Sequence, residues 1–161
     1  MMISKELNDA INAQIGSEFG AAQQYLSMAV YFDGEALPKL AEFFYKQSEE
    51  ERDHAMKFVH YLVDVGGTVT LPAVEAPKAT FSSAEEIFKL ALDWEMEVTR
   101  QVNNLYEIAR AKSDYAAENF LDWFVNEQIE EVSSMENMLK LVRRAGERNL
   151  IMMEAYFSHK E

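Results

Sequence analysis

Four long stretches of this chain carry apolar residues at every third or fourth position, which is the period of one face of an α-helix. Each series is interrupted near its middle by polar side chains: Glu18, Glu51 with His54, Glu95, and Gln128 with Glu131. Burying an ionised carboxylate is costly unless an opposite charge neutralises it. No Lys or Arg lies on these apolar stripes, which are the helix faces that the four series form. The pattern therefore predicts long helices that pack around a buried metal ion.

The helix-breaking residues and the apolar periods place the four helices along the chain. The predicted ranges are 4–32, 37–65, from Ser82 to a break at Ser113-Asp114, and from that break to Gly146. The third helix has two capping-box spacings at its start, Ser82 with Glu85 and Ser83 with Glu86. Few residues separate the helices within each pair, so each pair is predicted to be antiparallel.

Residues 66–82 contain two prolines and no helical period, which predicts an extended connection. Seventeen such residues reach roughly 56 Å, enough to run back along a helix of about 28 residues. The second and third helices would then be parallel, giving an all-α four-helix bundle with one long crossover. A short amphipathic segment follows, from Glu147 to about His159. It is either a fifth helix folded on the bundle end or a contact with other subunits.

Length and composition narrow the possible functions. A chain of 161 residues suits one domain, predicted over residues 1–161. The absence of Cys excludes disulfides, thiolate zinc sites and iron–sulfur clusters. The net charge of −13 argues against nucleic-acid binding and favours a field that concentrates cations. No apolar run approaches the roughly 20 residues that span a bilayer, and the N-terminus does not resemble a signal peptide. A cytoplasmic protein without a membrane partner is expected.

The interrupting residues lie halfway along their helices, so antiparallel packing places them at similar depth. Glu51 and His54 leave one helix face together, because they are three residues apart. Four carboxylates and one imidazole suit two iron or manganese ions better than zinc or copper. The alternative is that a predicted apolar stripe is misplaced by one residue. Glu95 or Glu131 would then lie beside the buried face as a solvated flank. Tyr25 lies on the face of Glu18, and is either a group that reaches the polar centre or a core aromatic.

Two other histidines, His60 and His159, lack carboxylates at helical spacing and are expected at the surface or in packing roles.

Three runs of sequence carry a resemblance to a known family: Tyr25 to Ala29, Glu49 to Ala55, and Trp123 to Gln128. With the helix lengths and the long crossover, the chain resembles the non-haem ferritins of bacteria and archaea over essentially its whole length. The bacterioferritin pattern has a second Glu-x-x-His where this chain has Gln128-Ile129-Glu130-Glu131. Arg52 stands where bacterioferritins offer a Met to haem, so no haem is expected.

The resemblance implies two irons in each subunit. One would be held by Glu18, His54 and a bridging Glu51. The other would be held by Glu51, Glu95 and Glu131.

The resemblance also implies roles for residues around this pair. Gln128 would donate a hydrogen bond to bound oxygen or water, and Tyr25 matches a family tyrosine close to the site. Glu50, Glu127 and Glu130 look like a third iron site, with a solvated acidic face as the alternative.

The implied function is iron storage and detoxification, in which dioxygen or hydrogen peroxide oxidises Fe(II) to Fe(III). The resemblance implies a hollow homo-oligomeric cage of 24 copies that holds the ferric mineral, with the fifth helix at its four-fold axes. Glu118 and Asp122 would line entry pores or serve as ordinary partners of a helix dipole. Two other interpretations compete: a stand-alone di-iron oxidase or peroxidase of the rubrerythrin sort, and a metal-free helical interaction module.

Overall fold

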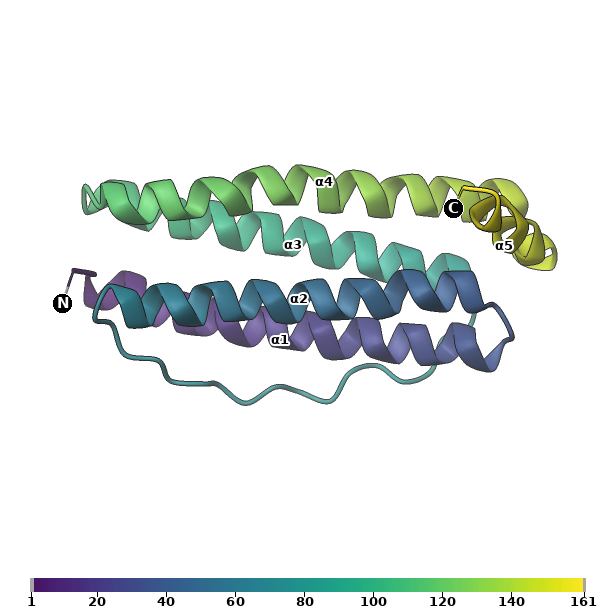
Figure 1. Ribbon diagram of the computed structural model, residues 1–161, viewed down its shortest axis with the longest axis horizontal. Coiled ribbons are helices and arrows are strands. Elements are labelled where there is room, and N and C mark those ends of the chain that lie inside the picture. The colour runs from purple at the N-terminus through teal and green to yellow at the C-terminus, as the bar shows by residue number, and fades with distance from the viewer. Residues whose placement is uncertain (1, 161) are drawn as a thin grey trace.

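The computed structural model describes residues 2–160 as four long helices with a short fifth helix at one end (Figure 1). Met1 and Glu161, the ends of the predicted domain, lie outside the described residues. The helices are α1 (Lys5–Gly34), α2 (Pro38–Asp64), α3 (Ala84–Ala111), α4 (Tyr115–Ala145) and α5 (Leu150–Ser158). Residues 2–160 contain no strand, so the prediction of an all-α fold is confirmed.

The helices begin where local side chains can satisfy their free N–H groups. Ser4 Oγ accepts from the backbone N–H of Leu7 at 3.2 Å at the start of α1. At the start of α3, Ser83 Oγ accepts from the N–H of Glu86 at 3.0 Å, as the capping-box spacing predicts. The Glu86 carboxylate accepts from the N–H of the preceding Ser82 at 2.6 Å. The predicted bounds of the first two helices differ from the observed ones by at most two residues.

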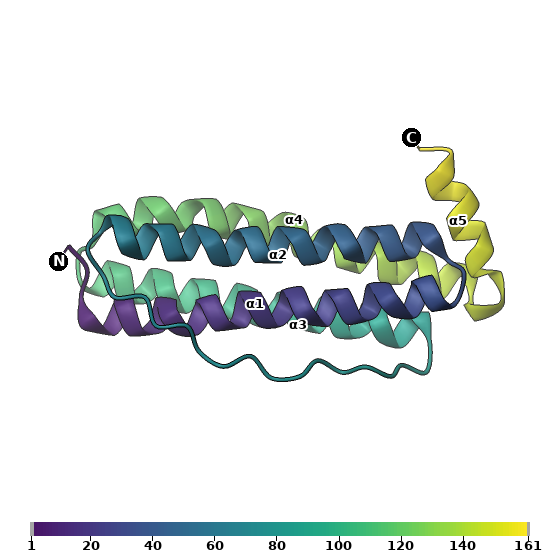
Figure 2. The same cartoon turned by 60° about the horizontal axis from the view of Figure 1, so that its bottom comes forward.

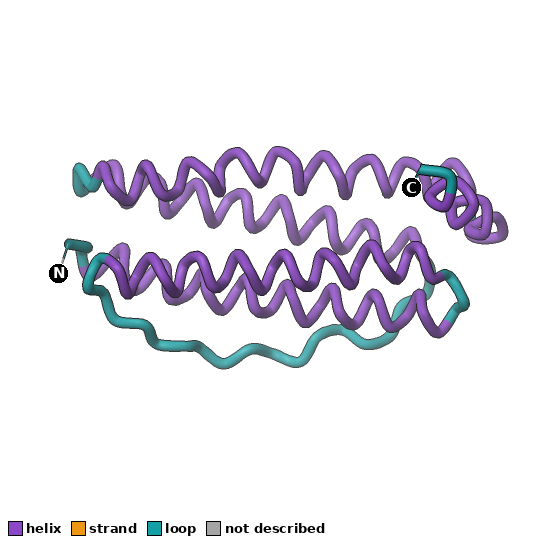
Figure 3. The backbone as a smooth tube through the Cα atoms, viewed as in Figure 1, coloured by secondary structure: helices purple, strands orange, loops and turns teal. Residues whose placement is uncertain are grey.

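The long connection over residues 65–83 runs beside α1 for the length of the bundle (Figure 2). It is a continuous loop without helix or strand (Figure 3). Amide side chains of α1 pair with its backbone. Asn8 Oδ1 accepts from the N–H of Thr68 at 2.9 Å, and Gln24 pairs with both the N–H and the carbonyl of Lys78, at 2.9 and 3.0 Å. The connection makes α2 and α3 parallel, as predicted.

Two apolar cores lie on either side of a polar mid-section. The α5-side core is built around Phe32, Phe44 and Phe88, with the rings of Phe32 and Phe44 stacked at 5.8 Å. The opposite core, called the N-terminal core, contains the stacked pair Phe58 and Phe124 at 4.1 Å. Side chains from all four long helices contribute to both cores.

The fifth helix folds on the bundle end, where Leu150 and Met153 join the α5-side core. It begins later than predicted, because Glu147–Asn149 form a 3-10 turn before it. The Glu154 carboxylate accepts from the backbone N–H groups of Lys39 and Leu40, at 2.7 and 3.0 Å, and so caps the start of α2.

The outer side of α5 exposes apolar side chains: Ile151, Met152 and Tyr156. None of the helices within residues 2–160 is long and apolar enough to cross a membrane.

Candidate metal centre

The polar mid-section brings together side chains from all four long helices. They are Glu18 from α1, Glu51 and His54 from α2, Glu95 from α3, and Gln128 and Glu131 from α4. Each of these residues is at most 4% exposed. The alternative that Glu95 or Glu131 forms a solvated flank is therefore wrong, because these two residues are 0% and 4% exposed.

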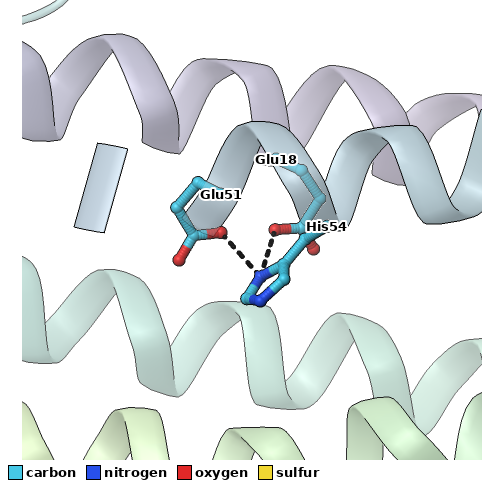
Figure 4. Close-up of side chains that lie close together, drawn as sticks. All are labelled: Glu18, Glu51 and His54. Carbon is cyan, nitrogen blue, oxygen red and sulfur yellow. Dashed lines mark hydrogen bonds and ion pairs between the residues drawn. The ribbon is translucent and has the colours of Figure 1, made fainter. Parts of the chain in front are cut away.

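The first potential metal-binding group consists of Glu18, Glu51 and His54, with one ligand atom of each within 4.8 Å of the others. His54 Nδ1 lies 3.2 Å from Glu51 Oε2 and 3.8 Å from Glu18 Oε2 (Figure 4). Glu51 and His54 project from the same face of α2 because they are three residues apart, and Glu18 meets them from α1. This group therefore belongs to the α1–α2 pair.

The second group consists of Glu51, Glu95 and Glu131, again with ligand atoms within 4.8 Å. It joins α2 to the α3–α4 pair. Because Glu51 belongs to both groups, it is placed to bind an ion of either one. The structure thus brings five of the six central residues together in the two groups that the family resemblance implied. The sixth, Gln128, contacts Glu95.

A third group lies toward the surface and consists of His54, Glu127 and Glu131. His54 Nε2 is 3.9 Å from Glu127 Oε1, so the two ring nitrogens of His54 face different carboxylates. Glu50 lies beside this group, and its pKa is raised by burial and by the charge of Glu127. Of the residues predicted for a third site, only Glu127 belongs to a group, because Glu50 and Glu130 are exposed and outside the three groups found among the described residues.

Tyr25 and Gln128 both bind Glu95. Tyr25 Oη donates to Glu95 Oε1, and Gln128 Nε2 donates to Glu95 Oε2 at 3.2 Å and to Thr99 Oγ1 at 3.1 Å. Tyr25 is fully buried and also packs on Phe44, with ring centroids 5.7 Å apart. Both interpretations of Tyr25 therefore hold, since it is a core aromatic whose hydroxyl reaches the polar centre.

Burial and mutual repulsion oppose ionisation of these carboxyls. Burial, followed by the charges of Glu18 and Glu95, raises the pKa of Glu51 well above its ordinary value. Burial and the charge of Glu95 also raise the pKa of Glu131, to about 9. The pKa of Glu95 is raised by burial too, although its hydrogen bonds with Tyr25 and Gln128 act in the opposite direction. The centre therefore favours bound protons or a bound cation.

Three carboxylate oxygens in the centre are buried without a hydrogen-bond partner: Glu18 Oε2, Glu51 Oε1 and Glu131 Oε2. Within residues 2–160, His54 is the only basic side chain within ion-pair distance of the central carboxylates. Buried polar atoms normally have partners, so these oxygens are available to bind a cation. Several oxygens and one imidazole form a donor set that fits iron or manganese.

Two further buried side chains, Gln14 and Gln47, were not predicted as part of the centre, although Gln47 lies on the predicted buried face of the second helix. Gln14 Nε2 donates to Glu18 Oε1 at 2.7 Å. Gln47 opposes the rise in the pKa of Glu131. Each glutamine lies four residues before a central carboxylate of its own helix, so helical spacing was the available signal.

The remaining predicted residues lie away from the centre. His60 and His159 are exposed, as expected. The proposed pore residues have local partners, since Glu118 lies 3.9 Å from Arg110 and Asp122 accepts from Tyr106 Oη at 3.0 Å.

Comparisons with known proteins agree on one family. A sequence model described as "Ferritin-like domain" matches residues 8–145. Ferritin BfrB of Mycolicibacterium smegmatis is 42% identical over 150 residues, which cover 93% of this chain and 82% of that protein. The bacterial non-heme ferritin of Staphylococcus aureus is 45% identical over 146 residues, covering 91% and 88%. The open pore ferritin of the hyperthermophilic archaeon Archaeoglobus fulgidus superposes with a TM-score of 0.93 at 37% identity, covering 97% of this chain and 98% of that one.

Proposed function

This chain belongs to the ferritin family, and we propose that it oxidises Fe(II) to Fe(III) at the buried centre and stores the product inside a hollow assembly of 24 copies. Iron storage is the function that its relatives support in general. The oxidation site, the mineral and the number of copies are the specific parts of the proposal.

The observation that carries the proposal is the pair of carboxylate groups that share Glu51 and contain unpartnered buried oxygens. Two Fe(II) ions bind as substrates, one at Glu18, Glu51 and His54, and the other at Glu51, Glu95 and Glu131. Each ion gives one electron to dioxygen or hydrogen peroxide, and the shared Glu51 keeps the two ions close together.

The chain also handles protons at this centre. The pKa of Glu131 is raised to about 9, so this carboxyl is protonated at neutral pH when no cation is bound. Binding of a cation releases this proton, because a ligating carboxylate must be ionised. The hydrogen bonds from Tyr25 and Gln128 keep Glu95 oriented throughout.

The third group provides a route between the centre and the surface. Glu127 is half-buried and faces His54 from the outer side, and Glu50 lies next to it. We propose that Glu50, Glu127 and Glu130 bind a third iron as it enters or leaves. Glu50 and Glu130 are exposed and form the outer part of this site.

Assembly is supported by apolar side chains that one copy leaves exposed. Leu26 and Val30 of α1 are 46% and 57% exposed, and the outer side of α5 adds a second patch. Exposed apolar surface of this kind favours contact with other copies. We propose that the whole chain, residues 1–161, acts as one domain in this assembly and works in the cytoplasm. The exposed Arg52 favours an assembly without haem.

The test is aerobic loading with a large excess of Fe(II), followed by size-exclusion chromatography with detection of protein and ferric iron. Ferric iron far above two per chain, co-eluting with a very large assembly, is the expected result. A small species with about two irons per chain would instead indicate a di-iron oxidase of the rubrerythrin sort. A protein without bound iron would indicate a metal-free interaction module.

A further inference from the structure

Resting on the proposed function, we infer that Gln14 is a positioning residue that tunes the first metal group through Glu18.

Gln14 fixes the orientation of the Glu18 carboxylate. Its Nε2 donates to Glu18 Oε1 at 2.7 Å, and both residues are at most 4% exposed. The other oxygen, Glu18 Oε2, is buried without a hydrogen-bond partner and lies 3.8 Å from His54 Nδ1. The amide therefore holds one oxygen and leaves the other directed into the first group.

An amide suits this positioning role better than a charged donor. A Lys or Arg in place of Gln14 would neutralise the carboxylate and compete with the metal, whereas an amide orients the carboxylate and leaves its charge available. Partners that orient metal ligands in this way typically change metal affinity roughly ten- to hundredfold.

Glu95 provides a contrast within the same centre. Tyr25 and Gln128 occupy both of its carboxylate oxygens, so neither oxygen is left without a partner. By comparison, Glu18 keeps one oxygen without a partner while Gln14 holds the other.

The experiment is a cobalt(II) titration of the full-length protein, because cobalt(II) binds similar ligands without the proposed oxidation. Calorimetry and visible absorption would follow the binding steps, and Glu18→Ala and Glu131→Ala would assign each step to a group. The test variant is Gln14→Met, which keeps side-chain length and removes the donor. Gln23→Met, on the exposed side of α1, is the matched control.

We expect Gln14→Met to weaken the first-group step roughly ten- to hundredfold and to leave the second-group step within about twofold. Gln23→Met should change neither step. Equal weakening of both steps by Gln14→Met, or no change in either step, would overturn the inference and leave the proposed function standing. If the unmodified protein showed no saturable binding, the proposed function and the inference would both fail. Thermal unfolding and assembly size would verify that each variant is folded.

Discussion

The apolar cores and the polar mid-section are built from the same four helices but have opposite physical properties. In the α5-side core, Phe44 contacts Phe32 and Phe88, with ring centroids 5.8 and 5.0 Å apart. In the mid-section, Glu51 lies among other carboxyls that raise its pKa, and its Oε1 has no partner. Hydrophobic burial in the cores stabilises the bundle, whereas the buried carboxyls of the metal-free mid-section destabilise it.

The comparison indicates that folding and function occupy different levels of one bundle. Because an apolar core lies on each side of the mid-section, the carboxyls can be held close together before a cation arrives. The predictions below test whether the cores supply the stability and the mid-section supplies the chemistry.

The largest effect on stability is expected from the core variant Phe44→Ala. It should lower the free energy of unfolding by about 3–5 kcal/mol, because it removes a large buried ring and leaves a cavity. Chemical denaturation followed by circular dichroism would measure the change. A loss below about 1 kcal/mol would show that the α5-side core contributes less to stability than this comparison requires.

The double variant Glu51→Ala with His54→Ala tests the mid-section. Fast iron oxidation should fall roughly a hundredfold or more, since even the outer partners of metal ligands are worth ten- to hundredfold. The fold should persist with an unchanged or raised melting temperature, because the change removes buried charge repulsion. Stopped-flow absorbance would give the oxidation rate, and calorimetry would give the melting temperature. Unchanged oxidation would place the reaction elsewhere in the molecule.

The pH dependence of the metal-free protein follows from Glu131. Burial raises its pKa from 4.5 to about 9, so between these values the folded protein holds a proton that the unfolded chain has lost. The free energy of unfolding should therefore fall as pH rises from about 5 to 9, by about 1 kcal/mol per pH unit.

Melting temperatures measured across this range would test the dependence. The variant Glu131→Gln should flatten it, since the amide does not titrate. Stability that rose with pH over the same interval would contradict the proposed electrostatics of the centre.

The smallest effect concerns the end of the bundle. The variant Glu154→Ala removes the carboxylate that accepts from the N–H groups of Lys39 and Leu40. Leu37, which precedes α2, makes no side-chain cap of its own. Loss of a cap typically lowers stability by about 1 kcal/mol, and α5 should become more sensitive to proteases.

Limited proteolysis with mass spectrometry would detect cleavage in residues 147–160. Equal protection in both proteins would show that Leu150 and Met153 alone hold α5.

Much of the fold could be predicted because it depends on periodicity. The stripes through Glu18 and Glu51 gave helix ends within two residues of those observed. Details that depend on tertiary contacts could not be predicted. The pairing of Gln24 with the Lys78 backbone requires the path of the long connection, and the 3-10 turn at Glu147–Asn149 interrupts a segment that looked continuous.

The same distinction applies to the candidate site. Carboxylates on an apolar stripe are conspicuous, so the members of the first two groups were predicted. Gln14 is uncharged, and an amide near the centre of a helix gives little indication of a role at the site. Its role becomes visible only once Gln14 is found beside Glu18.

The central claim is that the mid-section is a binding site for two cations in each chain. Anaerobic titration with Fe(II), followed by admission of dioxygen, tests it most directly. The account predicts saturation near two tightly bound Fe(II) per chain, with rapid oxidation of both when oxygen enters. In Glu51→Ala, which removes the shared ligand, both irons should bind weakly. Binding without saturation, or saturation that Glu51→Ala leaves unchanged, would contradict it.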